Sequence, residues 1–270
     1  MPSISLILST YNNPKFLEKV LAGYSHQSFK NFEIIIADDG STKDTKDLIH
    51  KFNQSISQNI FHVWHEDNGF RKCKILNKAI SKSSNEYLVF SDGDCIPNRT
   101  FLETHNKLAR KGHFLSGGHF PLCKKTSNAI KLDHIKSQIC FNKRFLMKNG
   151  QPIDKNYFKL IKNTFLMKIL DQITPTKPTF NGNNSSAWRE DIIFAKGLNE
   201  KMGYGSEDNE LGYRLNNNGI KSIQIRNRAK VLHLYHLRPY RNNDELMKNK
   251  AIANRTLSSK IIQTSYGIKD

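Results

Sequence analysis

The feature that most constrains this chain is a regular alternation of apolar runs and amphipathic segments in its first third. Apolar runs typical of buried strands occupy residues 3–10, 32–37, 60–64 and 88–90. Between them, apolar side chains recur at helical spacing over residues 14–27, 42–52 and 71–81. This order predicts an α/β protein with a mostly parallel, Rossmann-like sheet flanked by helices.

Two phosphate-binding motifs of such sheets are absent from the sequence. No G-x-G-x-x-G follows the first apolar run, and G-x-x-x-x-G-K-[ST] occurs nowhere in the chain. These absences argue against a dinucleotide-dependent dehydrogenase and against a P-loop NTPase.

A pair of carboxylates follows the fourth apolar run, in Ser91-Asp92-Gly93-Asp94. Residues i and i+2 of an extended strand point to the same side, so Asp92 and Asp94 are predicted to face one pocket. Open α/β sheets bind ligands at this end of their strands, and two hard oxygen donors suit Mg²⁺ or Mn²⁺. The alternative is a solvated Asp-Gly turn that closes a hairpin.

Charge and composition narrow the class of partner. The formal net charge of the 270 residues is +18, which implies an anionic partner: nucleic acid, anionic lipid, a phosphorylated substrate or an acidic polymer. No run of 18 apolar residues and no signal peptide is visible, so we expect a cytoplasmic protein. The four cysteines are far apart and are expected to be small buried hydrophobes.

Six short motifs resemble known glycosyltransferases. Those at residues 9–12, 38–41 and 91–94 resemble the nucleotide-sugar domain of family 2 glycosyltransferases with the GT-A fold. Those at residues 180–184, 203–208 and 233–236 resemble the C-terminal region of β-1,4-galactosyltransferases, and chondroitin-type bacterial polymerases share much of this pattern. The resemblance covers roughly residues 3 to 240 apart from a middle segment.

The resemblance implies a binding site for a UDP-sugar. In it Asp39 accepts the uracil imide hydrogen, Tyr11 packs on the base, and Ser9 belongs to the same substrate-binding set. Arg71 is placed to meet the nucleotide through planar hydrogen bonds, and Asp92 meets the ribose or completes the metal surroundings. The alternatives are a helix N-cap for Asp39 and a surface ion pair for Arg71.

The same resemblance implies a Mn²⁺ or Mg²⁺ site. Asp94 matches the metal-binding carboxylate, and His236 and His233 match the positions of the remaining ligands. In the galactosyltransferases the position of His233 holds a methionine, and Mn²⁺ accepts imidazole as well as carboxylate.

The catalytic residues implied by the resemblance are Asp208 and Glu207. Asp208 takes the position of the base in an inverting transfer, and Glu207 supports it by meeting sugar or acceptor hydroxyls. Tyr204 replaces the tryptophan that stacks on the sugar in the family. The alternative is that both acids only stabilise a helix N-terminus.

The donor sugar is predicted from the register between Gly182 and Glu207. In that register Thr179 stands where animal enzymes have a tyrosine that crowds the C2 substituent of the sugar. Threonine leaves space for an N-acetyl group, so UDP-GalNAc and UDP-Gal are the expected donors, followed by UDP-GlcNAc and UDP-Glc. The alternative is an ordinary strand residue in a shifted loop.

Residues 121–178 fall outside the resemblance and contain twelve basic residues against three acidic ones. Apolar side chains between residues 157 and 170 recur at helical spacing among lysines. A basic amphipathic helix of this kind either lies in an anionic membrane surface, on the inner face of the cell membrane, or packs with a lysine-rich solvated face.

The predicted organisation has four parts. Residues 1–120 form the nucleotide-sugar half, 121–178 the basic insert, 179–240 the acceptor and catalytic half, and 241–270 a helical tail. The predicted protein is an inverting, metal-dependent glycosyltransferase that acts on a glycan or lipid-linked oligosaccharide in bacterial surface polysaccharide synthesis. The rival class is a basic nucleic-acid- or polysaccharide-binding protein, although no zinc-finger, RNP-type or basic-region motif is present.

Overall fold

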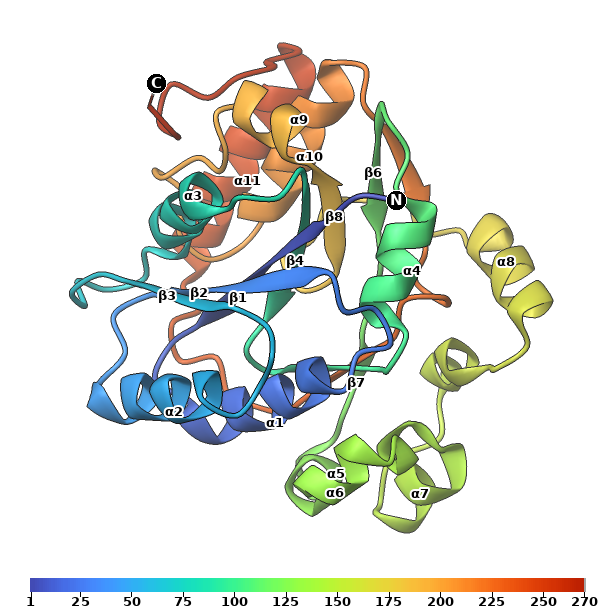
Figure 1. The fold of residues 1–270 in the computed structure, drawn as a ribbon. Helices are drawn as coiled ribbons and strands as arrows, with labels where there is room; N and C mark the ends of the chain where they lie inside the picture. Colours follow the sequence, from blue (N-terminus) through green and yellow to red (C-terminus); the bar gives the residue numbers. More distant parts are fainter. Residues whose placement is uncertain (270) are drawn as a thin grey trace.

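The computed structural model describes residues 1–269 and begins with the predicted alternation of strands and helices (Figure 1). The first seven elements are β1 (Ile4–Thr10), α1 (Pro14–Ser25), β2 (Phe32–Asp38), α2 (Lys43–Asn53), β3 (Ile60–Trp64), α3 (Lys72–Lys82) and β4 (Tyr87–Asp92). β1 pairs in parallel with β2 and β4, and β2 pairs in parallel with β3. The predicted α/β class is therefore confirmed.

The main sheet has seven strands in the order β3-β2-β1-β4-β8-β6-β9. Its second half consists of β8 (Ser185–Trp188), β6 (His113–Ser116) and β9 (Lys221–Gln224). β8 is antiparallel to both β4 and β6, whereas β6 and β9 are parallel. The sheet is thus mixed on one side and parallel on the other.

After β4 the chain enters a small second sheet. It contains β5 (Cys95–Pro97), β10 (Val231–His233) and β7 (Phe120–Pro121), in the order β5-β10-β7. Residues 93–94 join β4 to β5 in a different sheet, so the Asp-Gly pair does not close a hairpin. The structure rejects that alternative for the motif.

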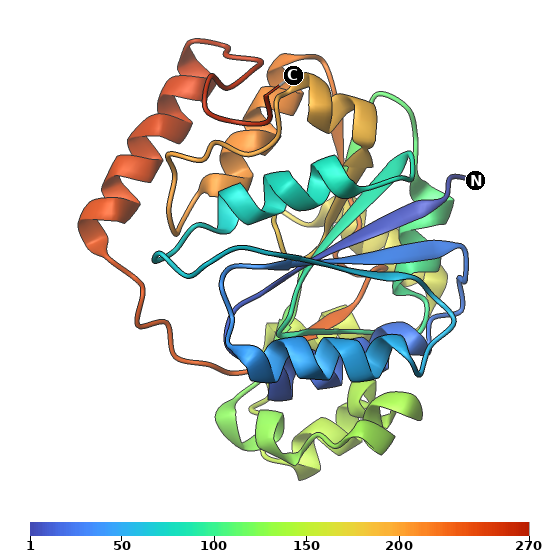
Figure 2. The ribbon, with the colours of Figure 1, turned by 60° about the vertical axis from the view of Figure 1, so that its left-hand side comes forward.

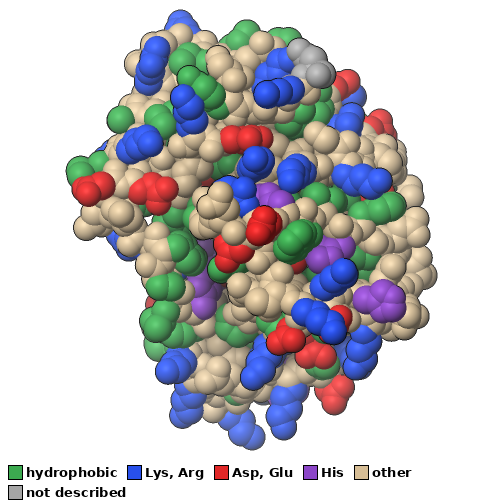
Figure 3. All heavy atoms as spheres, turned by 90° about the vertical axis from the view of Figure 1, so that its left-hand side faces the viewer, with side chains coloured by type: hydrophobic (Ala, Val, Ile, Leu, Met, Phe, Trp, Pro, Cys, Tyr) green, Lys and Arg blue, Asp and Glu red, His purple; other side chains and the backbone are tan. Residues whose placement is uncertain are grey.

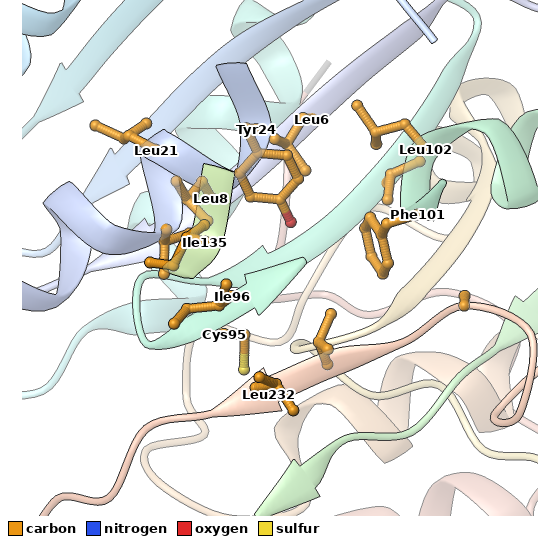
Figure 4. Close-up of a cluster of buried hydrophobic side chains, with 14 of the residues drawn as sticks. Leu6, Leu8, Leu21, Tyr24, Cys95, Ile96, Phe101, Leu102, Ile135 and Leu232 are labelled. Atoms are coloured by element: carbon orange, nitrogen blue, oxygen red, sulfur yellow. The ribbon is translucent and has the colours of Figure 1, made fainter. Parts of the chain in front are cut away.

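Helices cover both faces of the main sheet (Figure 2). Leu6 and Leu8 of β1 point to one face and pack with Leu17, Leu21 and Tyr24 of α1 (Figure 4). The intervening Ile7 points to the other face, where α3, α9 (Arg189–Phe194) and α10 (Glu207–Asn217) supply the core. This alternation places an apolar layer on each side of the strands.

One glycine allows the small sheet to approach α1 closely. A Cβ on Gly23 would lie 2.7 Å from Cδ of Pro97 at the end of β5, which is too close for a side chain. Behind β5, Phe101 and Leu102 of α4 (Phe101–Leu108) complete this part of the core.

The basic insert folds as a string of short helices beside the main body (Figure 1). They are α5 (Lys124–Ala129), α6 (Leu132–Lys136), η1 (Ile139–Phe141), α7 (Lys143–Lys148), η2 (Lys155–Leu160) and α8 (Thr164–Ile173). The prediction of a single amphipathic helix over residues 157–170 is wrong, because the chain is extended at Ile161. Asn163 then caps α8 by accepting a hydrogen bond from the Leu166 N–H.

The tail is helical only in part. α11 (Asn243–Ser258) packs against α10, and residues 259–269 have no regular secondary structure. Thr256 of α11 donates a hydrogen bond to Glu210 of α10, which also forms a fully buried ion pair with Arg214. Within residues 1–269, every helix is too short or too polar to cross a membrane.

Candidate active site

A cavity of about 540 Å³, the main cavity, opens at the carboxyl ends of β1, β2 and β4. The end of β10 and the start of α10 complete its wall. Figure 3 shows this side of the molecule, where acidic and histidine side chains gather near the centre among lysines and arginines. Open α/β sheets place their ligands at this edge.

Asp39, directly after β2, is held through both of its carboxylate oxygens. Nε2 of His65 lies 2.7 Å from Oδ1, and the Arg71 backbone N–H donates to Oδ2 over 2.9 Å. Burial raises the pKa of Asp39, and the hydrogen bonds from His65 and Arg71 oppose this rise. Each oxygen retains a lone pair for a ligand N–H. The N-cap of α2 is Thr42, so the N-cap alternative for Asp39 is rejected.

Tyr11 and Ser9 lie near Asp39 in the same wall. Tyr11 is half exposed and donates a hydrogen bond to Asp67 over 2.8 Å, which keeps its ring at the mouth of the cavity. Ser9, within β1, donates to Oδ1 of Asp92 on the adjacent strand β4.

Lys72, the first residue of α3, is the second partner of Asp92. Its Nζ donates to Oδ1 of Asp92 over 2.8 Å. Burial by itself would lower the pKa of Lys72, but the carboxylates of Asp92, Glu207 and Asp208 raise it above its usual value. A charged ammonium group therefore lies between the strand-end carboxylate and the two acids of α10.

Asp94 and two histidines form a compact group at the end of β10. Oδ2 of Asp94 lies 2.9 Å from Nε2 of His236 and 3.6 Å from Nε2 of His233. The two imidazole rings stack with their centroids 5.3 Å apart. Burial alone would raise the pKa of Asp94, but the His236 hydrogen bond and the nearby His233 lower it to about 2. This carboxylate is ionised at neutral pH.

Cys95 also lies near Asp94 and His233 and must be weighed against His236 as a metal ligand. The ligand atoms of Asp94, Cys95 and His233 lie within 4.8 Å of one another. However, burial raises the pKa of the Cys95 thiol well above its usual value, and the thiol donates a hydrogen bond to Asp94. Metals bind the thiolate, and this thiol is held protonated, so Cys95 is a weaker candidate ligand than His236.

Glu207 and Asp208 open α10 at the opposite wall of the main cavity. Asp208 accepts a hydrogen bond from the Gly182 N–H over 2.7 Å and another from Asn209. Burial, followed by the charge of Asp208, raises the pKa of Glu207 to about 7. Burial also raises the pKa of Asp208, with the Gly182 hydrogen bond opposing it.

The turn before α10 requires small residues. Gly205 has φ +104°, and a Cβ there would lie 2.3 Å from Cδ2 of Leu246 in α11. Its N–H donates to Oε2 of Glu207 over 2.7 Å. The tail helix therefore supports the loop that presents the two acids.

Three aromatic rings meet at the rim of the main cavity. The Tyr204 ring lies 5.9 Å from Phe70 and 4.9 Å from Tyr240 between centroids, and Phe70 and Tyr240 are 5.6 Å apart. Such a cluster offers ring faces and two phenolic hydroxyl groups to a ligand.

Most of the predicted site residues line this cavity, and three do not. The residues that line it are Ser9, Tyr11, Asp39, Asp92, Asp94, Tyr204, Glu207, Asp208, His233 and His236. The Arg71 side chain turns to the backbone oxygen of Glu66, and Gly182 acts through its hydrogen bond to Asp208. Thr179 lies outside the cavity lining, where its backbone N–H donates to the Ser116 hydroxyl and its backbone oxygen accepts from the same hydroxyl.

Sequence reasoning missed Phe70, Lys72 and Tyr240, which line the main cavity, and His65, which contacts Asp39. Phe70 and Lys72 flank Arg71, so the sequence motif around Arg71 indicated the right segment but the wrong side chain. His65 directly follows β3, and a polar residue at a strand end is a signal that could have identified it. Tyr240 lies in the link to α11 and had no sequence signal.

The family of the chain follows from a match over most of its first two thirds. Residues 5–170 match the model of the family described as glycosyl transferase family 2. The chain belongs to glycosyl transferase family 2.

Similar proteins that carry a name include two bacterial enzymes. Chondroitin synthase of Escherichia coli is 26% identical over 227 residues, which are 80% of this chain and 32% of that protein. The GalNAc(5)-diNAcBac-PP-undecaprenol beta-1,3-glucosyltransferase of Campylobacter jejuni is 26% identical over 207 residues, which are 77% and 58% of the two chains. The chain thus spans about a third of the first relative and somewhat over half of the second.

Solved structures share the fold. S. aureus TarS 1–349 in complex with UDP-GlcNAc superposes with a TM-score of 0.65 at 15% identity, covering 97% of this chain and 67% of that one. The mannosyltransferase PcManGT from Pyrobaculum calidifontis, in complex with GDP-Man and Mn²⁺, gives 0.64 at 18% identity, with coverages of 94% and 64%. The predicted GT-A fold is confirmed.

Proposed function

We propose that the protein is an inverting, metal-dependent glycosyltransferase that moves a hexose or N-acetylhexosamine from a UDP-sugar to a glycan. The observation that supports this most directly is the pairing of two groups across one cavity. Asp94, His233 and His236 form a metal-binding set, and Glu207 and Asp208 face them from α10.

The distances from Asp94 to the two histidines fit Mn²⁺ or Mg²⁺. Metal–oxygen bonds of about 2.1 Å at right angles place neighbouring ligand atoms about 3 Å apart. The carboxylate of Asp94 lies 2.9 Å and 3.6 Å from the two imidazole nitrogens. When bound, the metal ion stabilises the negative charge that develops on the diphosphate of UDP.

Asp39, Tyr11 and Ser9 are the proposed uridine-binding residues. Asp39 accepts the imide hydrogen of uracil on an oxygen that retains a lone pair, and Tyr11 packs against the base. Asp92 lies between Ser9 and Lys72 and would meet the ribose or complete the surroundings of the metal. Arg71 holds Asp39 through its backbone N–H rather than through its guanidinium group.

Asp208 is the proposed base and Glu207 its supporting acid. The acceptor hydroxyl attacks the anomeric carbon from the face opposite UDP, and Asp208 takes its proton. The Gly182 N–H fixes the orientation of that carboxylate. Glu207 binds sugar or acceptor hydroxyls, and Tyr204 packs on the sugar with its aromatic neighbours.

UDP-GalNAc and UDP-Gal remain the first proposed donors, with UDP-GlcNAc and UDP-Glc as the alternatives. Thr179 gives this choice no support, because it does not line the cavity. The choice rests on the resemblance to galactosyltransferases and on the likeness to an enzyme named chondroitin synthase.

The proposed acceptor is a glycan or lipid-linked oligosaccharide in bacterial surface polysaccharide synthesis, at the inner face of the cell membrane. One relative is named for an undecaprenol-linked substrate. The insert also exposes Ile153, Phe158, Phe165 and Ile173 by 60% or more, among lysines that favour an anionic membrane.

Isothermal titration with UDP, with and without Mn²⁺, tests the proposal. We expect metal-dependent binding in the micromolar range, followed by transfer from one of the four UDP-sugars to an oligosaccharide, detected by mass spectrometry. Absence of UDP binding together with tight, salt-sensitive RNA binding would favour the rival nucleic-acid-binding class.

A further inference from the structure

A second cavity, of about 600 Å³, lies where the basic insert meets the small sheet. Asn98 and Arg99 follow β5, and Lys230 precedes β10, so one wall comes from the end of the β5–β10 ladder. The other walls come from Ile139 and from the link between η2 and α8, which includes Lys162. The hydrogen bond from the Arg99 N–H to Gln138 joins the two parts.

The second cavity is separate from the main cavity. Lys230 precedes β10 and His233 ends it, so the two residues lie three positions apart along extended chain. At about 3.3 Å per residue the two sites lie on the order of 10 Å apart along the strand. No residue lines both cavities.

Its charge is positive and is not neutralised. Arg99, Lys162 and Lys230 line it, and none of its lining residues is acidic. Over residues 1–269, none of these three cations forms an ion pair with a carboxylate. Burial, followed by the charges of Lys162 and Lys143, lowers the pKa of Lys230 to about 8. An anion here would relieve this repulsion.

The remaining wall is partly apolar. Ile139 is 46% exposed at this place, and Phe141 and Leu160 complete the apolar side. The side-chain oxygen of Asn98 is buried without a hydrogen-bond partner and, as an acceptor, suits a hydroxyl or other donor group of a ligand rather than a phosphate oxygen.

We propose that this second cavity binds a phosphate or diphosphate group. A guanidinium group and two ammonium groups provide charge-assisted hydrogen bonds to several phosphate oxygens at once. Sites at the junction of two structural parts commonly bind small ligands, and an apolar wall suits an anion attached to a hydrocarbon. The phosphate comes from a free anion or from a lipid headgroup.

Calorimetry with inorganic pyrophosphate in EDTA tests the proposal, because the chelator removes metal-dependent binding near Asp94. We expect the double variant Arg99→Gln/Lys162→Gln to bind pyrophosphate at least about tenfold more weakly than wild type. Lys43→Gln/Lys46→Gln, on the exposed surface of α2, is the matched control for loss of two positive charges. UDP binding with Mn²⁺ should stay unchanged in all variants, which verifies their folding independently.

Sedimentation with vesicles distinguishes the two sources of phosphate. Loss of binding to phosphatidic acid vesicles in the double variant, with phosphatidylcholine vesicles as the reference, assigns the cavity to a lipid headgroup. Pyrophosphate binding without a vesicle effect assigns it to a soluble anion. The proposal is overturned if the wild type binds neither probe, or if the double variant binds both as the wild type does.

Discussion

Nζ of Lys72 lies 2.8 Å from Oδ1 of Asp92, and this ion pair joins the start of α3 to the end of β4 inside the main cavity. Glu207 and Asp208 lie close enough to raise the pKa of the same ammonium group. Lys72 therefore balances three carboxylates that would otherwise repel one another and the diphosphate of the proposed donor.

Replacing Lys72 by methionine tests this role. Lys72→Met keeps the length of the side chain but removes the charge, so we expect kcat/KM for the UDP-sugar to fall by about tenfold or more. Lys74→Met, on the exposed face of α3, is the matched control and should retain activity. Equal activity of both variants would show that Lys72 has only a packing role.

Replacing Asp208 by asparagine tests the proposed base. Asp208→Asn is nearly isosteric and cannot take a proton, so transfer should fall by on the order of 10²-fold or more. UDP binding should survive, because the proposed metal ligands are untouched. Asp244→Asn, at the exposed start of α11, is the control. Near-normal turnover in Asp208→Asn would reduce Asp208 to a stabiliser of the helix N-terminus.

Removing one proposed metal ligand at a time tests the metal site. Asp94→Ala and His236→Ala should each abolish Mn²⁺-dependent UDP binding in calorimetry, since each removes a ligand from the set. His50→Ala, on exposed α2, should bind UDP as the wild type does. Unaltered metal dependence in His236→Ala would transfer the ligand role to His233 or remove histidine from the site.

Glu207 makes the stability of the protein depend on pH. Its pKa in the folded protein is about 7, above the usual 4.5, so the neutral carboxyl is favoured on folding. Its contribution to stability is complete below about pH 4.5 and is lost as the pH rises through 7. Glu207→Gln should therefore raise the free energy of unfolding at pH 8.5 by about 1–3 kcal/mol more than at pH 5. Urea unfolding at the two pH values measures this difference, and equal effects would contradict it.

Thr179 provides a test of the donor preference. Because the Thr179 side chain does not line the main cavity, Thr179→Tyr should leave the ratio of kcat/KM among the four UDP-sugars unchanged. Steady-state kinetics with UDP-GalNAc, UDP-Gal, UDP-GlcNAc and UDP-Glc measure that ratio. A loss of UDP-GalNAc use in the variant would show that Thr179 belongs to the sugar-binding site.

The parallel half of the fold and the strand-end acids could be predicted from the sequence because both are local in origin. Each of the first four strands carries its own apolar pattern, and parallel strands bring their carboxyl ends to one edge. Asp39, Asp92 and Asp94 each follow or end such a strand, so their meeting in one cavity follows from the sheet. The other predicted site residues came from the resemblance to known motifs.

The tertiary structure alone decided the contacts between segments that are distant in the chain. The direction in which α3 starts places the side chain of Lys72 in the main cavity and turns that of Arg71 away from it. Tyr240 reaches the rim through the packing of α11 on Gly205. The break at Ile161, whose carbonyl accepts a hydrogen bond from Lys230, and the anchoring of α8 through Asp171 and Arg228 likewise depend on long-range contacts. Periodicity records which face of a segment is apolar, whereas the partner of a charged side chain depends on how whole elements pack. For that reason the sequence determined the parallel half of the sheet and its acidic edge, and only the packed chain determined which cations meet it.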